Sequence, residues 1–345
     1  MPVPSLTRAS ATDPSRIYRY RDGLYGVDLL TAAVVHFEFF TWLAAHPSDL
    51  DGICAGLGLA KRPADVMLTL FTANGFVSCQ GGTFSVTEAA REHLVAGSSF
   101  NLTPYYASLA ERPVVQDFTQ VLKTGKPAHW AGVRDGKDWH VSMEDPAFAR
   151  RFTAAMDCRG HFLAQALAAR LDLTGRSRIL DVGGGSGIYA CVLAAHHPSI
   201  SALVFDQPPV DRIARALVAE RECEGQVQVE AGNFFTDVWP GGCDVHLLSN
   251  VLHDWDEGDA RRILQASAAA LPPGGLLVIH DAFINAEKTG PLPVAEYSCL
   301  LMHSTQGKCY STAEYGAMLS DAGFEVGPYT DTAADRGVMT ATKRF

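Results

Sequence analysis

The sequence predicts an α/β fold that follows a mainly helical N-terminal region. Short apolar segments alternate with amphipathic helices after residue 177, whereas the first hundred residues combine helical apolar spacing with a single hairpin pattern. A glycine-rich turn comes directly after the first of the apolar segments. Because 345 residues exceed the usual size of one domain, we expect two, residues 1–105 and residues 106–345, the second opening with a helical linker.

The N-terminal region carries the pattern of a winged helix. Apolar residues at helical spacing predict three helices, over 24–45, 48–57 and 62–74, with Ser48 as the N-cap of the second. The first is apolar on every side, which predicts burial in a core or in a subunit interface. Two alternating strands are expected within 76–87, around a Gly81-Gly82 turn.

Charge and composition narrow the range of partners. The net charge is -10 and the third helix of the winged-helix pattern has no cluster of basic residues, so we expect no nucleic-acid partner and favour dimerisation. The chain shows neither a signal-peptide core nor an apolar run of about 18 residues, which predicts a cytoplasmic protein without membrane contact. Eight scattered cysteines without C-x-x-C spacing predict reduced thiols, with no disulfide framework and no metal site.

The C-terminal half carries the α/β pattern. Residues 103–170 are predicted to be mainly helical, with a break at Gly125-Lys126-Pro127. Five strands are expected after them, at 178–182, 202–206, 227–232, 245–252 and 276–283. Helices between these strands are expected to begin near Gly187, Pro209 and Glu257. Strands that alternate with helices favour right-handed crossovers and a parallel sheet covered on both faces.

A cofactor site is predicted where the first strand runs into segment 181–187, DVGGGSG, and then into a helix. Glycines let a ligand lie against the main chain at the helix N-terminus, and Asp206 at the end of the next strand can accept both hydroxyls of a ribose. A dinucleotide site would need glycine where Ile188 stands, and Asp181 beside the turn suits a cation better than a pyrophosphate. We therefore expect S-adenosylmethionine, released as S-adenosylhomocysteine, rather than NAD.

Together with GNFF at 232–235 and VLHDW at 251–255, these features give the chain a family resemblance over nearly its whole length. It resembles the plant caffeate and bacterial small-molecule O-methyltransferases. The resemblance implies a Rossmann-like S-adenosylmethionine-binding methyltransferase domain and an N-terminal winged-helix dimerisation domain. It also implies a homodimer in which neighbouring subunits help to close the pocket.

The resemblance, read together with the position of Asp181, assigns seven cofactor-binding residues: Asp181, Gly183, Gly185, Asp206, Asn233, Phe234 and Ser249. The glycines would cradle the amino-acid part of the cofactor, Asp206 would hold the ribose, and Phe234 would face the adenine ring. Asn233 stands where the family carries aspartate, and its carbonyl oxygen would accept from the adenine amine. Ser249 stands where plant members carry lysine.

The resemblance further makes His253 the general base, since a neutral imidazole can take a proton from a phenol. Two acidic residues usually orient that histidine. The first falls on Asp281, one methylene shorter than the usual glutamate, and the second falls on Cys309, a thiol where glutamate is expected. That departure takes a carboxylate out of the pocket and points to a reshaped acceptor site.

Four residues are expected to line the acceptor pocket: Phe148, Phe152 and Met156 at helical spacing, and His303. Tyr105, Tyr106 and Arg112 are further candidates in the helical linker, where an arginine could hold a substrate carboxylate.

The predicted function is therefore transfer of a methyl group to the oxygen of a small phenolic acceptor. A phenolate is also nucleophilic at its ortho carbons, so ring C-methylation is the alternative, for instance on an aromatic amino acid of the tyrosine or hydroxykynurenine type in secondary metabolism. A winged-helix protein that senses a ligand without catalysis is a further alternative, which the intact His253 disfavours. An NAD-dependent oxidoreductase is disfavoured by Ile188 and Asp181.

Overall fold

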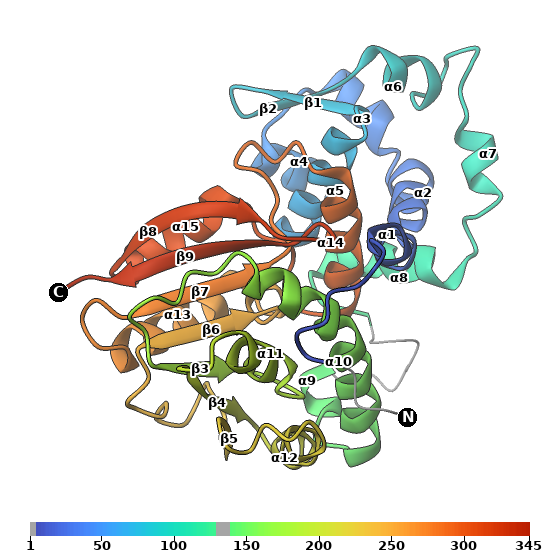
Figure 1. Cartoon of the computed structure of the whole chain (residues 1–345). Helices are drawn as coiled ribbons and strands as arrows, with labels where there is room; N and C mark the ends of the chain where they lie inside the picture. The colour runs from blue at the N-terminus through green and yellow to red at the C-terminus, as the bar shows by residue number, and fades with distance from the viewer. Residues whose placement is uncertain (1–4, 129–138) are drawn as a thin grey trace. The chain divides into compact units, whose positions relative to one another are not determined.

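The computed structural model describes residues 5–128 and 139–345 (Figure 1). It contains two compact units. The sheet unit comprises Met1–Arg16, Trp139–Phe283 and Thr312–Phe345, and the helical unit comprises Ile17–Asp138 and Ile284–Ser311. Each unit thus combines segments that are distant in sequence, unlike the two continuous domains, 1–105 and 106–345, expected from the sequence.

The sheet unit contains seven strands in the order β5-β4-β3-β6-β7-β9-β8. Their bounds are β3 Arg178–Val182, β4 Ser201–Asp206, β5 Val227–Ala231, β6 Val245–Ser249, β7 Leu276–Asp281, β8 Phe324–Asp331 and β9 Gly337–Lys343. The first five in this order are parallel, whereas β9 and β8 pair antiparallel. The predicted α/β class and all five predicted strands are confirmed, although the antiparallel edge makes the sheet mixed.

Helices flank this sheet. They are α9 Trp139–Ser142, α10 Pro146–Ala168, α11 Ile188–His196, α12 Val210–Glu220, α13 Glu257–Ala270 and α15 Thr312–Asp321. Helices α10, α11 and α12 pack together, and α13 packs with α15 (Figure 1). Every residue of β7 is buried, which explains its continuous apolar run. Strand β3 pairs with both β4 and β6, so the chain reverses its direction across the sheet at β3 and creates the crevice where open α/β sheets bind ligands.

In the helical unit, the single helix predicted over 24–45 is wrong, because two helices occupy that stretch. Helix α2, Gly26–His36, ends before Glu38, whose φ of 44° is left-handed, and α3, Phe39–Ala45, begins immediately after it. The break lets two consecutive rings be buried together. Phe39 and Phe40 lie 5.5 and 5.1 Å from the ring of Phe71, measured between centroids.

The segment expected to form a winged helix contains α4 Leu50–Leu57, α5 Lys61–Ala73, β1 Val77–Gln80 and β2 Thr83–Val86. The hairpin is confirmed, with positive φ at Gly81 and Gly82. Ser48 is not the cap of α4, because Asp49 accepts from the backbone N–H of Gly52 at 2.8 Å. The backbone of Ser48 instead bonds that of Phe84 in the hairpin.

The remaining helices of this unit are α6 Glu88–His93, α7 Thr103–Ala107, α8 Pro113–Thr124 and α14 Leu292–Ser304, and α1 Ser15–Asp22 crosses the boundary between the units. Helix α8 ends at Gly125, so the predicted break is confirmed. Segment 284–311 joins this unit because α14 packs on α5, and because Arg62 donates to the carbonyl oxygens of Gly307 and Gly125 at 2.6 and 2.8 Å.

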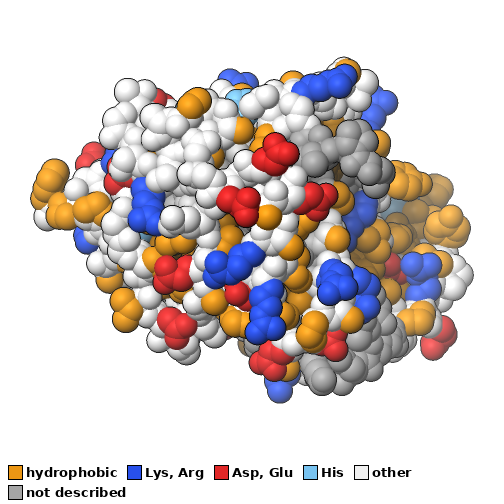
Figure 2. Space-filling model, turned by 60° about the horizontal axis from the view of Figure 1, so that its bottom comes forward, with side chains coloured by type: hydrophobic (Ala, Val, Ile, Leu, Met, Phe, Trp, Pro, Cys, Tyr) orange, Lys and Arg blue, Asp and Glu red, His pale blue; other side chains and the backbone are white. Residues whose placement is uncertain are grey.

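Basic and acidic side chains are interspersed on the face drawn in Figure 2, without a continuous field of one sign. Within residues 5–128 and 139–345, no single helix is long and apolar enough to cross a membrane. One bent pair, Ser15–His36 with Phe39–Ala45, passes the same test by length and composition only.

Candidate active site

The glycine turn between β3 and α11 exposes main chain at the carboxyl end of the sheet. Gly183 and Gly185 have φ of 63° and 58°, a left-handed conformation that side chains disfavour. A Cβ added to Gly183 would lie 3.2 Å from the side chain of Val251 and 3.6 Å from that of Phe234, so a larger residue would crowd the turn. These glycines therefore keep the turn open to a ligand.

Asp206, at the end of β4, is held by backbone donors. Its carboxylate accepts from the N–H groups of Gly185 and Gln207, both at 2.8 Å. Burial raises the pKa of Asp206 to about 6, and the two backbone donors partly oppose that rise. Each carboxylate oxygen keeps a lone pair beyond these bonds, which suits the two hydroxyls of a ribose.

Two buried acceptor atoms lie on neighbouring strands, at the point where the sheet reverses direction. Oδ2 of Asp181, in β3, and Oδ1 of Asn250, directly after β6, make no hydrogen bond to any residue of the described ranges. Burial raises the pKa of Asp181 to about 7, although the backbone N–H of Ala190 opposes it. A buried acceptor without a donor is costly, and an N–H donor of a bound ligand would satisfy either atom. The crevice thus fits the cationic amino-acid part of S-adenosylmethionine.

Asn250 is a site residue that sequence reasoning missed. Its Nδ2 donates to the hydroxyl oxygens of Tyr189 and Ser249, both at 3.2 Å, which fixes the amide with its carbonyl oxygen turned away from them. Its φ of 54° is uncommon for a residue with a side chain, and such conformations concentrate at functional sites. Asparagine tolerates this conformation better than most residues, but a sequence does not reveal which asparagine adopts it.

The predicted adenine residues follow β5. Oδ1 of Asn233 accepts from the backbone N–H of Phe235 at 2.9 Å, and one lone pair of this oxygen remains for a ligand. The ring of Phe234 lies 5.9 Å from that of Trp255, edge to face, and its backbone oxygen accepts from the indole of Trp239. These contacts build an aromatic wall after the strand that follows Asp206.

The predicted general base meets its predicted partner. His253 lies in the short helix η1, Leu252–Asp254, and its Nδ1 is hydrogen-bonded to Oδ1 of Asp281. The carboxylate also accepts from the N–H of Ala282 at 2.7 Å and from the hydroxyl of Tyr315 at 3.2 Å. Burial alone would raise the pKa of Asp281, but the charge and hydrogen bond of His253, followed by Ala282 and Arg336, outweigh burial and hold it below its usual value.

An ionised Asp281 fixes the tautomer of His253. Because Asp281 only accepts, Nδ1 carries the hydrogen and Nε2 presents a lone pair. Oδ1 of Asp254 lies 3.7 Å from Nε2, which sequence reasoning did not foresee although Asp254 is the next residue. Burial raises the pKa of Asp254 to about 6, with the charges of His253 and Arg159 opposing it. A second carboxylate therefore borders the basic nitrogen.

The predicted acceptor residues of the sheet unit lie on α10. Phe148 is buried, and its ring stacks on that of Phe152 at 6.3 Å, while Met156 is half-buried one turn further on. Gly160 of the same helix packs on α11, where an added Cβ would come within 2.6 Å of Ile188. This close approach fixes α10 against α11.

The other predicted residues belong to the helical unit. Cys309 is buried, and its N–H donates to Oγ of Ser298 at 3.1 Å. His303 is fully buried on α14, 3.4 Å from Asp117 and 4.7 Å between ring centroids from Tyr25.

The three linker candidates belong to the same unit. The guanidinium of Arg112 donates two hydrogen bonds to the carboxylate of Asp28, at 2.6 and 3.2 Å. Arg112 is therefore paired with an acid of the protein itself rather than presented to a substrate carboxylate. Tyr105 is exposed and Tyr106 half-buried. Across residues 5–128 and 139–345, no group of three or more His, Cys, Asp or Glu side chains is placed to hold a metal ion.

Comparison with known proteins agrees with this geometry. A model of the O-methyltransferase domain matches residues 116–325. Over 312 residues the chain is 33% identical to 3-hydroxy-5-methyl-1-naphthoate 3-O-methyltransferase of Streptomyces sahachiroi, which covers 90% of this chain and 89% of the relative. L-tyrosine C(3)-methyltransferase of Streptomyces lavendulae is 30% identical over 303 residues, or 84% of this chain and 82% of the relative.

A solved structure is similar over nearly the whole chain. The O-methyltransferase family 2 protein from Planctomyces limnophilus DSM 3776, in complex with apigenin, matches with a TM-score of 0.89 and 29% identity, covering 99% of this chain and 100% of that one. The predicted resemblance is thereby confirmed, as is the Rossmann-like fold. The chain that carries this glycine turn and this His253–Asp281 pair belongs to the O-methyltransferase family and is an S-adenosylmethionine-dependent methyltransferase.

Proposed function

We propose that this enzyme methylates the phenolic oxygen of a small aromatic acceptor, with His253 as the general base. The observation that carries the proposal is the bond between Nδ1 of His253 and the buried carboxylate of Asp281, which leaves Nε2 as a proton acceptor. S-Adenosylmethionine supplies a methyl group already activated by its sulfonium, so the protein has only to place and deprotonate a nucleophile.

Each residue then has a defined task. Nε2 of His253 takes the phenolic proton, and Asp281 stabilises the imidazolium that forms. Asp181 and Asn250 hold the cationic amino-acid part of the cofactor, Asp206 holds the ribose, and Gly183 and Gly185 admit it to the turn. Asn233 and Phe234 receive the adenine, and Ser249 is a further proposed cofactor residue.

The acceptor class is supported by two similar proteins. By its name the relative at 33% identity methylates an oxygen of a hydroxynaphthoate, and the structure at 29% identity holds apigenin. Both molecules carry phenolic hydroxyl groups on fused rings. We propose that Phe148, Phe152 and Met156 of the sheet unit present an apolar wall to such rings. His303 and Cys309 of the helical unit are proposed separately as acceptor-binding residues.

Ring C-methylation is the second candidate. The relative at 30% identity is by its name a tyrosine C(3)-methyltransferase, and the family glutamate is replaced by Cys309 in this chain. The same base and cofactor serve either reaction, because a phenolate carries charge on oxygen and on its ortho carbons. The orientation of the ring against the methyl group then decides the product.

We also propose that the enzyme works as a homodimer whose interface lies on the helical unit. The exposed stripe consists of Ile17 and Tyr20 of α1, Leu24 between the two helices and Val27 of α2. All four are more than two-fifths exposed and follow one another at a spacing of three, four and three residues. Burial of this stripe against a second copy would remove the apolar surface from water.

One spectrum tests the reaction. The protein is incubated with methyl-¹³C S-adenosylmethionine and a mixture of phenolic acids, flavonoids and tyrosine, and carbon spectra are recorded. An aryl ether methyl signal is expected. A ring methyl signal would establish the C-methylation candidate, and no labelled product with any phenol would overturn the acceptor class.

A further inference from the structure

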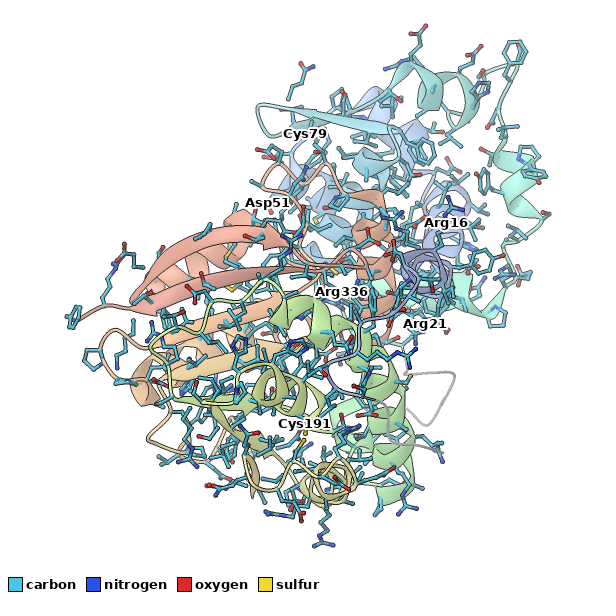
Figure 3. The ribbon with its side chains drawn as sticks, in the orientation of Figure 1. Arg16, Arg21, Asp51, Cys79, Cys191 and Arg336 are labelled. Atoms are coloured by element: carbon cyan, nitrogen blue, oxygen red, sulfur yellow. The ribbon has the colours of Figure 1, made fainter. Side chains whose placement is uncertain are left out.

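A chain of polar side chains leads from the turn between β8 and β9 to the side chain of Asn250. It begins at Thr332, in the turn that also contains Arg336, which is labelled in Figure 3. It continues through His280 of β7 and Ser249 of β6, which the sheet register pairs with each other. Neighbouring members of the chain are joined by hydrogen bonds of 3.0 to 3.3 Å.

The first hydrogen bond of the chain determines where His280 carries its hydrogen. Oγ1 of Thr332 donates its one hydrogen to the carbonyl oxygen of Arg336 at 3.0 Å. The same oxygen lies 3.0 Å from Nε2 of His280 and can only accept there. His280 is fully buried, and burial lowers its pKa to about 3, so the ring is neutral and has a single hydrogen. That hydrogen is on Nε2, and Nδ1 presents a lone pair.

The second hydrogen bond determines where the hydroxyl hydrogen of Ser249 points. Oγ of Ser249 lies 3.3 Å from Nδ1 of His280, which has no hydrogen to give. Ser249 is therefore the donor in this bond, and its oxygen has only lone pairs left for other neighbours. Nδ2 of Asn250 lies 3.2 Å from that oxygen and donates to it.

These directions set the orientation of the Asn250 amide. Its nitrogen also donates to the hydroxyl of Tyr189 at 3.2 Å, but that hydroxyl can accept or donate and so permits either amide orientation. Ser249, whose hydrogen is already used, permits only one. Oδ1 of Asn250 is therefore the end of the amide left without a hydrogen bond within residues 5–128 and 139–345. A half-turn of the amide would replace this acceptor with N–H groups.

The position of His280 on β7 separates it from the general base. Its ring lies 5.6 Å from that of Tyr189 of α11, whereas the carboxylate of Asp281, the next residue, accepts from Tyr315 of α15. Consecutive residues of a strand point to opposite faces of the sheet. His280 and Asp281 thus support different groups, and a change at His280 leaves the hydrogen bond between Asp281 and His253 in place.

We propose that His280 is a positioning residue for the cofactor. Held by Thr332 and acting through Ser249, it orients the amide of Asn250 so that Oδ1 accepts an N–H of the amino group of S-adenosylmethionine. This inference rests on the proposed role of Asn250 in binding the cofactor. It extends the cofactor site to the turn at 332–336, which lies beyond the matched family segment, residues 116–325.

The first test compares Thr332→Val, which removes the hydroxyl and keeps the shape, with Thr332→Ser, which keeps the hydroxyl. In Thr332→Val, Nε2–H of His280 loses its acceptor, so the ring should move its hydrogen to Nδ1 and donate to Ser249. Ser249 can then donate to Asn250, whose amide turns. We expect the Kd of S-adenosylhomocysteine to rise about tenfold in Thr332→Val and to stay within about twofold of the parent in Thr332→Ser.

Two further measurements distinguish positioning from a general structural role. Long-range proton–nitrogen spectra of histidine-labelled protein report the tautomer of His280, whose signals are those that His280→Phe removes. We expect Nε2–H in the parent and in Thr332→Ser, and Nδ1–H in Thr332→Val. Because Ser249→Ala interrupts the chain, adding Thr332→Val to that variant should raise the Kd by less than about twofold more.

An Nδ1–H tautomer in the parent, an unchanged Kd in Thr332→Val, or an equal effect of Thr332→Val with and without Ser249 would overturn the proposal. If Thr332→Val does not fold, His280→Phe carries the same expectation for the Kd. Asn250→Ala, run in parallel, should weaken binding about tenfold or more. Normal binding in Asn250→Ala would overturn the proposed cofactor role of Asn250 itself, whereas weak binding there with normal binding in Thr332→Val overturns only the role of His280.

Discussion

Nδ1 of His253 donates to the buried carboxylate of Asp281, and this single bond determines which ring nitrogen can act as a base. Asp281 also accepts hydrogen bonds from the N–H of Ala282 and the hydroxyl of Tyr315. Residues of β7 and α15 therefore set the orientation of the imidazole. The base is therefore positioned by the sheet, although it stands on a short 3₁₀ turn.

Replacing the base should separate catalysis from binding. His253→Ala is expected to lower kcat by about a hundredfold or more, since general base catalysis contributes on that order, with cofactor affinity nearly unchanged. Asp281→Asn should lower kcat by at least about tenfold, because the amide can present N–H to Nδ1 and favour the wrong tautomer. Single-turnover rates measure the loss of catalysis in each variant, and S-adenosylhomocysteine titrations measure its cofactor affinity. A rate of His253→Ala near that of the parent enzyme would show that His253 is not the general base.

Cofactor binding should release protons. The pKa of Asp181 is raised to about 7 and that of Asp206 to about 6 in the free enzyme, so both hold protons part of the time near pH 6.5. The cofactor ammonium and ribose hydroxyls favour the ionised carboxylates and lower both values, so protons leave on binding and affinity rises as pH increases toward about 7.

Calorimetry of S-adenosylhomocysteine binding in buffers of different ionisation enthalpy measures this release directly. Asp181→Asn should abolish much of the release and weaken binding. Asp244→Asn offers a control, because Asp244 accepts from the backbone N–H groups of Ser177 and Arg178 at the opposite, amino end of the parallel strands. Equal heats in every buffer would contradict the assignment of Asp181 to the cofactor site.

The close crossing of α10 and α11 should make Gly160 intolerant of a side chain. A Cβ there would lie 2.6 Å from Ile188, so Gly160→Val is expected to destabilise the fold by about 1–3 kcal/mol. Gly316, in α15, has nothing within 4 Å of an added Cβ, and Gly316→Ala should be neutral or stabilising by up to about 1 kcal/mol. Chemical denaturation compares the two, and an equally stable Gly160→Val would show that the helices can separate.

The thiol at 309 is expected to control the acceptor pocket. Cys309→Glu should change the ratio of O-methyl to C-methyl product, or the preferred acceptor, by severalfold or more, because a carboxylate is returned to a buried position. Cys309→Ser serves as the matched control of similar size. Product analysis by mass spectrometry and carbon NMR reports the ratio, and identical products from the Glu variant would show that Cys309 lies apart from the acceptor.

Oligomeric state should depend on the exposed stripe of α1 and α2. Tyr20→Glu combined with Val27→Glu is expected to convert a dimer into a monomer, because charged side chains resist burial in an apolar interface. Val238→Glu, at an exposed apolar residue of the sheet unit, should leave the dimer intact. Light scattering coupled to size-exclusion chromatography measures the molar mass of each variant. A dimeric mass for the double variant would show that the interface lies elsewhere.

Local sequence patterns predict most of the sheet and the candidate cofactor residues at its edge. Strands β3 to β7 are short apolar runs bounded by turns, and burial on both faces requires such runs, so they can be recognised without tertiary information. The glycine turn and Asp206 can be recognised in the same way, since they lie at the carboxyl ends of predicted strands, which share one edge of a parallel sheet. The role of His253 is implied by the family resemblance. The break between α2 and α3 at Glu38 was not predicted, because the apolar residues keep a helical spacing across it.

Tertiary structure decided everything that depends on register. Strand β8 is largely half-buried or exposed and β9 lies beyond an irregular turn, so neither carries a pattern strong enough to predict. The pairing of β9 with β7 nevertheless sets Gly337 opposite Asp281, residues that are 56 positions apart in the chain. Asn250 likewise became a candidate site residue only in the folded chain, through its positive φ and the two hydrogen bonds that its amide donates. A sequence displays which groups can ionise or accept, but only the folded chain decides which of them share a buried charge, because that depends on distances that pairing across the sheet creates.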